Sequence, residues 1–279
     1  MAIFKVENEY NNQLQLSQNE NKWQLTSVIG LNQPPANIAT SIIPNFDGAR
    51  FNSSRLEPRN IVITLAIKGN IETNRMLLNS VIFSKRYIKV YYQNNSLNVY
   101  QEGYVESFEY DVFEQGVMAQ ISIICPDPFW RDVETNISVL TPIINLFEFP
   151  FTIPEEGIPF GEIIANITNI IQNNGSANTG TIITINSDYT VLNPSITNIT
   201  TGQTMLINEE LANNSQIIIS TIRGKKSIYM DGINIINKLD ESSEWIELVP
   251  GDNSFSLTAD YGLDHMRVSV AFQNLYGGV

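Results

Sequence analysis

The chain has 279 residues, of which 43% are hydrophobic and 10% aromatic, and its formal net charge is −13. This length predicts two domains of ordinary size, and the apolar content is enough for packed cores, which excludes a disordered chain. No apolar run approaches the roughly 20 residues of a membrane-spanning helix, and the first residues do not resemble a secretory leader. A single cysteine cannot close an intrachain disulfide, so we expect a fold that is stabilised by packing alone, as suits folding in a cytoplasm.

The charge is unevenly distributed along the chain. Residues 1–133 contain 11 Lys and Arg against 13 Asp and Glu, a net charge of −2, whereas residues 134–279 contain 5 against 16, a net charge of −11. Such a difference indicates two units with different surroundings. The acidic second part repels phosphate backbones, so we expect no binding to nucleic acid. A charge that merely keeps the protein soluble explains the excess equally well.

The first part of the chain is typical of short β-strands interrupted by one helix. Residues 60–68 (NIVITLAIK) alternate between two faces with period two and end at a Gly-Asn pair. Asn70 is a suitable N-cap for the helix that follows, whose apolar stripe is formed by Leu77, Leu78, Val81 and Ile82. Residues 87–93 and 97–108 flank an Asn-Asn-Ser turn and predict a hairpin, and residues 117–125 predict a further apolar strand.

Residues 123–132 (IICPDPFWRD) contain the only cysteine and end the first part of the chain. Pro126 and Pro128 have no amide donor, so strand pairing is expected to stop at Cys125. A nucleophilic cysteine needs a nearby base, and the single histidine, His265, is far along the second part. We therefore interpret Cys125 as a buried structural residue and this stretch as a domain boundary.

The second part begins with an extended connector over residues 134–165, which is rich in proline and phenylalanine and has no helical period. Strands follow at close spacing with turn sequences between them and no helical segment, which predicts a β-sandwich or jelly roll. The predicted strands are residues 181–186, 204–211, 216–222, 226–232, 244–249, 253–259 and 266–276.

Motifs for catalysis or for metal binding are absent from the sequence. One His and one Cys cannot supply a zinc site, and the chain has neither a P-loop, nor GxGxxG, nor a GxSxG elbow that would pair with His265. Glu244 and Glu247 are formally a carboxylate pair, and Asp260 and Asp264 could belong to a calcium loop. In so acidic a region we interpret all four as solvated carboxylates. The sequence thus predicts no enzyme and no catalytic, cofactor or metal site.

Two aromatic residues of the second part allow a sugar-stacking platform, namely Trp245 and Tyr261. Trp245 lies beside Ile246 and Leu248, however, and aromatic residues dominate protein cores. We favour packing for Trp245 over a role in carbohydrate recognition.

Segments in both parts resemble the phage distal tail proteins, and the resemblance covers nearly the whole chain. In the first part it is carried by residues 59–70 (RNIVITLAIKGN), 75–81, 88–93, 102–113 and 120–130 (QISIICPDPFW). In the second part it is carried by residues 147–154 (FEFPFTIP), 173–185, 193–208, 224–234, 242–257 and 275–279 (LYGGV).

The resemblance implies a mainly β fold with three segments. Residues 1–133 would form an N-terminal β-sandwich-like belt domain with one helix, residues 134–165 the connector, and residues 166–279 a galectin-like β-sandwich. It also implies a virion structural protein, a baseplate hub without enzymatic activity or cofactor. Exposed strand edges of the belt domain, such as residues 87–93, are expected to pair between subunits.

The implied partners are other copies of the chain, in a homo-hexameric ring, and further tail proteins. The ring would join the tail tube to the tail-associated fibre or lysin protein and carry receptor-binding proteins, at the tip of a phage tail or of a prophage-derived particle assembled in the host cytoplasm. The alternative is a carbohydrate-binding adhesion module that contacts the host cell wall, and a wall-degrading hydrolase is a third class. The second part has one His, and its only arginines are Arg223 and Arg267, so the side-chain cluster with which galectins bind sugar is not evident and the resemblance implies no lectin site.

Overall fold

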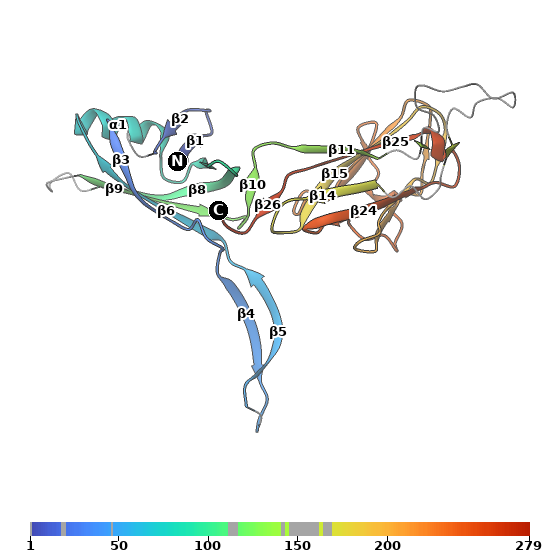
Figure 1. Ribbon diagram of the computed structural model, residues 1–279, viewed down its shortest axis with the longest axis horizontal. Coiled ribbons are helices and arrows are strands. Elements are labelled where there is room, and N and C mark those ends of the chain that lie inside the picture. Colours follow the sequence, from blue (N-terminus) through green and yellow to red (C-terminus); the bar gives the residue numbers. More distant parts are fainter. Residues whose placement is uncertain are drawn as a thin grey trace, which may run out of the picture. The chain divides into compact units, whose positions relative to one another are not determined.

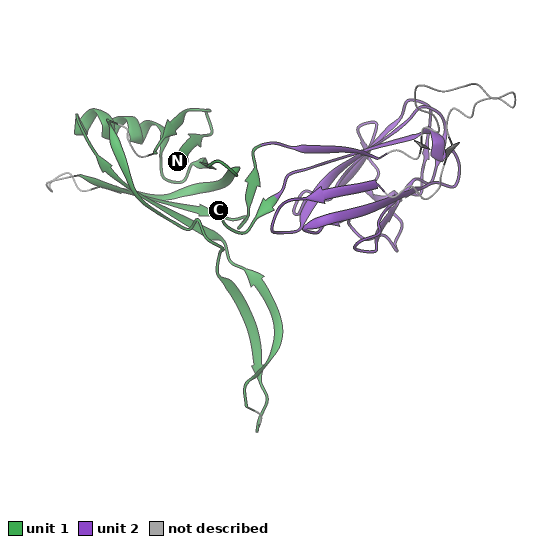
Figure 2. Ribbon diagram, in the orientation of Figure 1, with its two compact units in different colours: residues 1–133, 275–279 green, residues 134–274 purple. Residues whose placement is uncertain are grey.

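The computed structural model describes residues 2–17, 21–45, 47–110, 117–140, 143–144, 162–163 and 169–279. The chain forms two compact units, shown in different colours in Figure 2: residues 1–133 with 275–279 form unit 1, and residues 134–274 form unit 2. Both units are built from antiparallel strands, with a single α-helix in the described residues (Figure 1). The predicted mainly β fold with sandwich-like units is therefore confirmed. No helix among the described residues is long and apolar enough to cross a membrane.

Unit 1 is built on one curved antiparallel sheet. The strands of its main path lie in the order β2-β1-β7-β8-β9-β6-β3, and β10 pairs with both β8 and β26. A separate two-stranded ribbon, β4–β5, also belongs to this unit. Its elements are β1 Ile3–Asn8, β2 Gln13–Gln15, β3 Trp23–Ile29, β4 Ala36–Ile42, β5 Ala49–Leu56, β6 Arg59–Ile67, α1 Ile71–Val81, β7 Tyr87–Gln93, β8 Asn98–Tyr110, β9 Met118–Cys125, β10 Trp130–Asp132 and β26 Leu275–Tyr276.

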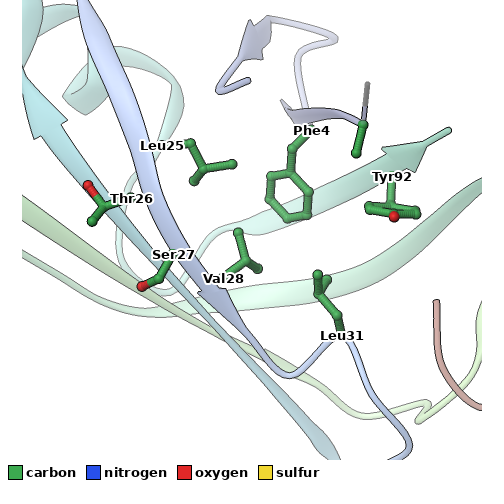
Figure 3. Close-up of a pocket in the computed structure, with 8 residues that line it drawn as sticks. Phe4, Leu25, Thr26, Ser27, Val28, Leu31 and Tyr92 are labelled. Atoms are coloured by element: carbon green, nitrogen blue, oxygen red, sulfur yellow. The ribbon is translucent and has the colours of Figure 1, made fainter. Parts of the chain in front are cut away.

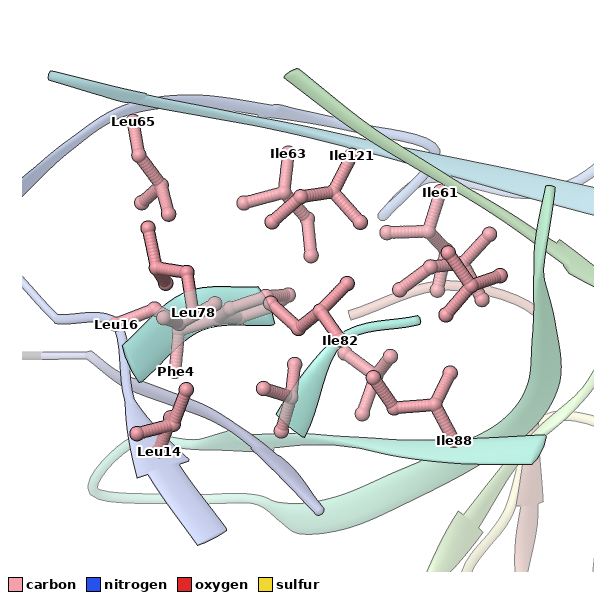
Figure 4. Packing of buried hydrophobic residues seen from close by; sticks show 14 of the residues in the cluster. Phe4, Leu14, Leu16, Ile61, Ile63, Leu65, Leu78, Ile82, Ile88 and Ile121 are labelled. Carbon is pink, nitrogen blue, oxygen red and sulfur yellow. The ribbon is translucent and has the colours of Figure 1, made fainter. Parts of the chain in front are cut away.

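The helix and the central strand of unit 1 form as their sequence patterns predict. Asn70 is the N-cap of α1, and its side chain accepts a hydrogen bond from the Thr73 amide at 3.1 Å. Alternate residues of β6 are buried, which puts Ile61, Ile63 and Leu65 into the core. Figure 4 shows these side chains facing Leu78 and Ile82 from the helix region, Phe4, Leu14 and Ile88 from β1, β2 and β7, and Leu16, which directly follows β2. The sheet folds over the helix and encloses one apolar core.

Two expectations about the strands of unit 1 have different outcomes. Strand β9 ends at Cys125, directly before Pro126, as predicted. The expectation that residues 87–93 offer a free edge is wrong, because β7 pairs with β1 on one side and with β8 on the other. The N-terminal strand β1, to which the sequence analysis assigned no structure, fills that edge. The free ends of the sheet are β2 and β3 instead.

Unit 2 is a β-sandwich. Its larger sheet has the order β11-β25-β15-β20-β21-β22 with β23 beside β15, and its smaller sheet has the order β14-β24-β17-β18. The strands are β11 Asn136–Leu140, β12 Ile143–Ile144, β13 Glu162–Ile163, β14 Asn169–Asn173, β15 Thr179–Ser187, β16 Val191–Leu192, β17 Ser195–Asn198, β18 Gln203–Leu206, β19 Glu210–Leu211, β20 Gln216–Ser220, β21 Ser227–Met230, β22 Ile233–Asn234, β23 Glu247–Leu248, β24 Gly251–Thr258 and β25 Met266–Phe272, with short 3-10 helices at Ile236–Lys238 and Leu263–His265. Inward residues of both sheets, such as Ile183 and Val270 from one and Phe255 and Met205 from the other, share one core.

Two boundaries of the second part differ from those predicted. Residues 136–140 are not connector, because they form β11 and pair along their whole length with β25. The last five residues, 275–279, do not belong to the second domain, because β26 pairs with β10 in unit 1. Unit 2 is thus inserted between two paired strands of unit 1. The remaining connector residues lie mostly outside the described residues.

A buried arginine joins the segments that meet at this insertion. Arg59, at the start of β6, is 2% exposed, and all five of its N–H donors bind backbone carbonyls. Its Nε and one Nη bind the Pro128 carbonyl at 2.9 and 2.7 Å, and the Nη atoms also bind the carbonyls of Gly30, Asn32 and Gly277. Burial lowers the pKa of the guanidinium. One side chain therefore connects β6 to the chain before β4, to the chain before β10 and to the C-terminal tail.

Two glycines allow the close packing around Arg59. Gly30 has φ +89°, and a Cβ atom there would lie 2.0 Å from the Asn60 carbonyl oxygen. A Cβ atom on Gly278 would lie 2.9 Å from the Gln33 amide nitrogen. The tail is also held by a hydrogen bond from the Val279 amide to the Leu31 carbonyl at 3.0 Å. A side chain at either glycine would separate the C-terminal tail or β6 from the residues that precede β4.

Replacing Arg59 by Met should destabilise unit 1 by about 3–5 kcal/mol, because the carbonyls that it binds would stay buried without a donor. Arg59→Lys should have an intermediate effect, since lysine keeps the charge but has three donors rather than five. Urea unfolding followed by tryptophan fluorescence measures this in a Trp245→Phe background, in which the remaining Trp23 and Trp130 are both buried in unit 1. Arg55→Met is the matched control because Arg55 is exposed on β5. Equal shifts in the unfolding midpoint of the Arg59→Met and Arg55→Met variants would contradict the role of Arg59.

The Cys125 thiol should not react with a thiol reagent until unit 1 unfolds. Its side chain is fully buried, and burial raises the pKa of the thiol to about 12, so almost no thiolate forms at neutral pH. Titration with an aromatic disulfide reagent should show no rapid release of thiolate from the native chain and one equivalent in denaturant. Rapid labelling of the native protein would show that the end of β9 is open to solvent.

Candidate functional site: the exposed arm of unit 1

Strands β4 and β5 form a ribbon that projects from unit 1 (Figure 1), here called the arm and defined as residues 36–56. Cross-strand partners share a face, and β5 carries one extra residue near Asn52. This register gives the arm one face without charged residues, formed by Ala36, Ile38, Thr40, Ile42, Ala49, Phe51, Ser54 and Leu56. The opposite face is polar and is formed by Asn37, Ala39, Ser41, Arg50, Ser53 and Arg55.

The uncharged face of the arm is uncovered. Ile38 is 59% exposed, Ile42 84%, Phe51 59% and Leu56 41%, and every described residue of the two strands is exposed. A two-stranded hairpin is at best marginally stable in water without packing against another element. Large apolar side chains gathered on one face mark a surface that another molecule covers. The arm is therefore the candidate assembly surface of this protein.

The polar face of the arm carries its positive charge. Ser41 donates a hydrogen bond to the Asn52 side chain at 3.3 Å, and Arg55 lies 3.6 Å from the Glu57 carboxylate. These contacts are solvent-exposed and contribute little stability. They nevertheless distinguish the two faces, since the polar one is compatible with water.

The arm is not among the elements predicted from the sequence. Residues 36, 38, 40 and 42 alternate with polar or small residues in period two, and Pro44, Asn45 and Gly48 are typical of a turn, so a hairpin pattern was present. The alternation of Ile38 and Ile42 indicates a strand with one apolar face. It does not tell whether that face is covered within the chain.

Strands β7 and β8 carry a group of tyrosines on the face opposite the core. Tyr87 and Tyr104 lie edge to face with ring centroids 6.0 Å apart, and Tyr91 and Tyr100 are separated by the same distance. The Tyr87 hydroxyl donates to Glu102 at 2.8 Å, and burial followed by this contact raises the Tyr87 pKa. This surface is aromatic, but carboxylates and lysines interrupt it.

Residues considered for chemistry take ordinary structural roles where the structure describes them. His265 ends a 3-10 helix, and its Nδ1 lies 2.7 Å from Asp188, whose other carboxylate oxygen accepts from Arg267 at 3.1 Å. Cys125 lies in unit 1 and His265 in unit 2. These contacts lie at the surface of unit 2, where the side chains of His265, Asp188 and Arg267 are all partly exposed.

The four carboxylates do not gather into a site among the described residues. Asp260 accepts a hydrogen bond from the Asn193 side chain at 2.8 Å, and Asp264 lies 3.5 Å from His265. Glu247 accepts from the Asn178 side chain at 3.4 Å, and Glu244 is exposed. Within the described part of the chain, no group of three or more His, Cys, Asp and Glu side chains is arranged to hold a metal ion. That the whole chain lacks such a site stays a prediction.

The two aromatic residues considered for sugar binding differ in burial. Trp245 is partly buried against the core of unit 2, and Lys226 lies over its ring at 5.2 Å from the centroid. Tyr261 is 59% exposed. Packing is thus the role of Trp245, as predicted, and its stacking face is occupied by a lysine.

Comparison with family models assigns both units. Residues 16–125 match the model described as phage tail protein RIFT-related domain, and residues 174–276 match the model described as siphovirus-type tail component, C-terminal domain. The two matches cover most of unit 1 and most of unit 2. The comparison with curated protein sequences gives no match.

Solved structures share the fold over the full length of the chain. The Dit protein of phage SPP1, described as a paradigm of the hub adsorption apparatus in phages that infect Gram-positive bacteria, matches with a TM-score of 0.69 and 12% identity, covering 98% of both chains. A chain of the phage P2 baseplate, described as being in its activated conformation with Ca, matches with a TM-score of 0.51 and 11% identity, again covering 98% of both chains. With the family models, these likenesses confirm the resemblance found in the sequence: the chain belongs to the siphovirus-type distal tail protein family and is a structural component of a phage tail.

Proposed function

We propose that six copies of the chain close into a ring at the tip of the tail, and that this ring joins the tail tube to the fibre or lysin protein and to the receptor-binding apparatus. The observation that carries this proposal is the arm. A face that exposes Ile38, Ile42, Phe51 and Leu56 has no cover among the described residues of its own copy, and a neighbouring copy would supply it.

A contact through the arm is of the head-to-tail kind. One copy offers the arm, and the next offers a different surface that receives it. Such contacts generate a closed ring when the rotation from copy to copy sums to a full turn. They leave no arm uncovered, and each copy both gives and receives one contact. Closure would therefore stabilise all arms at once.

The distribution of charge supports unit 1 as the ring-forming unit. Its residues sum to −2, and the uncharged tail 275–279 leaves that sum unchanged, whereas unit 2 carries −11. Six nearly neutral units can come into contact with little repulsion, but six strongly acidic units repel each other. We infer that unit 1 forms the ring and that unit 2 lies outside it, free to hold other tail proteins. The hub role named for the similar Dit protein supports this arrangement.

Adhesion to wall carbohydrate is the second candidate, and the outer face of the larger sheet of unit 2 does not favour it. The row formed by Val139, Ser269, Thr184 and Ile218 across neighbouring strands is aliphatic or small, and the exposed Tyr229 on β21 is the one aromatic residue that continues it. Sugar recognition needs several directed polar groups beside an aromatic platform. The role proposed here is assembly, without a chemical reaction.

Replacing Phe51 by Glu should prevent ring formation, because the interface would then bury an unpaired charge. Light scattering across a concentration series should show wild type near six times 31.4 kDa and Phe51→Glu near 31.4 kDa. Ser53→Glu introduces the same charge on the polar face of the arm and is the matched control, expected to assemble as wild type does. Both substitutions are at exposed positions, so neither should alter the unfolding midpoint. Equal masses for the two variants would contradict the proposal.

The purified chain should also show no binding to wall polysaccharides. Surface plasmon resonance over immobilised wall glycans should give a flat response at concentrations where the ring has formed. A saturable response that Tyr261→Ala abolishes would favour the adhesion module instead, because Tyr261 is an exposed aromatic residue of unit 2.

A further inference from the structure

The curved sheet of unit 1 is not closed into a barrel. The main path of strands ends at β3 on one side and at β2 on the other, and β3 pairs with β6 alone among the described strands. In Figure 3, side chains from β3 face side chains from β1 and β7 across a gap. We call this gap the seam, defined by the eight residues that line it: Ala2, Phe4, Leu25, Thr26, Ser27, Val28, Leu31 and Tyr92.

The seam is an apolar cavity with no charged residue in its lining. Its volume is about 370 Å³. Leu25 and Val28 point into it from β3, and Phe4 and Tyr92 face them from the other wall (Figure 3). Ile29, at the end of β3, is 65% exposed and extends the apolar surface beyond the cavity. A hollow of this size and lining can hold large apolar side chains.

The edge of β3 is shaped for side-chain insertion rather than for strand addition. The pairing of β3 with β6 shifts between Leu25 and Ser27, which leaves Thr26 as an extra residue in the strand. A bulge of this kind bends an edge strand and interrupts a regular ladder. A partner would therefore insert apolar side chains between the two walls rather than continue the sheet.

We propose that the seam receives the uncharged face of the arm of a second copy, with Phe51 as the anchor. This inference rests on the proposed ring, because it names the surface that accepts the arm there. The arm of the same copy does not fill the seam, since its large apolar side chains are exposed and the ribbon runs away from the sheet (Figure 1). Donor and acceptor are thus different surfaces of one chain, as a head-to-tail ring requires.

The distribution of charged residues favours the seam, rather than the tyrosine surface of β7 and β8, as the acceptor of the arm. The arm face and the seam lining both lack charged residues, so their contact would bury no unpaired charge. On the tyrosine surface, Lys5 lies over Tyr91 and Lys89 lies over Tyr100, and Glu102 accepts from Tyr87. Covering those charged groups with Ile42 and Phe51 would remove them from water without new partners.

Charges placed in the seam test this inference. Val28→Glu puts a carboxylate on one wall, and Ala2→Glu does so from the other wall at an exposed position where loss of folding is not expected. Each variant should weaken assembly about thirtyfold or more, the effect of losing a central anchor. Gln24→Glu is the matched control: Gln24 is exposed on β3 and is not among the residues that line the seam, so this variant should assemble as wild type does.

Mixing two defective copies gives a sharper test. A copy with Phe51→Glu keeps an intact seam, and a copy with Ala2→Glu keeps an intact arm. Each alone should remain near 31.4 kDa, whereas the equimolar mixture should contain a species of about twice that mass that grows no further. A mixture that stays monomeric at a concentration where wild type assembles would overturn the inference.

The two proposals fail in different ways. If Phe51→Glu abolishes assembly but both seam variants still form rings, the arm contact stands and the seam is not its acceptor. If Phe51→Glu assembles normally, the proposed ring contact itself is wrong.

Crosslinking decides the case in which wild type remains monomeric at accessible concentrations. Ala2→Cys and Phe51→Cys copies, mixed at high concentration with a short bismaleimide, should yield a covalent dimer, because the native Cys125 is buried and does not compete. Replacing Phe51→Cys by Ser53→Cys in the mixture should remove that dimer. Equal yields in the two mixtures would overturn the inference.

Discussion

The structure of unit 1 depends on one buried cation. Arg59 has no carboxylate among its described partners, and its charge is distributed over carbonyls from segments that are far apart in the sequence. A guanidinium can hold several carbonyls at once because its five donors diverge in one plane, which a lysine cannot reproduce. Arg59 also lies against the Trp130 ring, 5.6 Å from its centroid, so the strand that leads into unit 2 is fixed by the same side chain.

This arrangement links the base of the arm to the strands that connect the two units. Gly30 and Asn32 lie just before the arm, and Pro128 and Gly277 lie close to the strands that lead to and from unit 2. A shift of the arm base would move the Gly30 and Asn32 carbonyls and so disturb the guanidinium of Arg59. The same guanidinium binds the carbonyls next to β10 and β26. The arm needs such a rigid base, since its own two strands provide little stability. The two units also differ in charge, because unit 1 is nearly neutral and unit 2 is strongly acidic.

Elements that depend on neighbouring residues could be predicted from the sequence. The pairing of strands that lie far apart in the sequence could not. The alternation in β6, the cap at Asn70 and the end of β9 before Pro126 follow from residues that are neighbours in sequence. The covered edge of β7 does not, because its partner β1 lies about 85 residues away, and neither strand encodes the pairing. The return of residues 275–279 to unit 1 likewise depends on Arg59, which gave no sign in the sequence of being buried. The arm was missed for a different reason: its pattern is that of any amphipathic hairpin, and only the structure shows its apolar face uncovered.

The insertion of unit 2 between β10 and β26 also has a mechanical consequence. The chain leaves unit 1 after Asp132 and re-enters before Leu275, so both crossings lie at the same end of the paired strands. Tension applied through unit 2 is thus shared by two strands that are pulled in the same direction, and their mutual hydrogen bonds are not peeled apart. The load is transferred instead along the pairing of β10 with β8, where Arg131 and Asp132 lie opposite Tyr100 and Val99, and to the carbonyls held by Arg59. Loading along the strand axis strains several hydrogen bonds at once, and it therefore meets more resistance than peeling the same hydrogen bonds apart one by one.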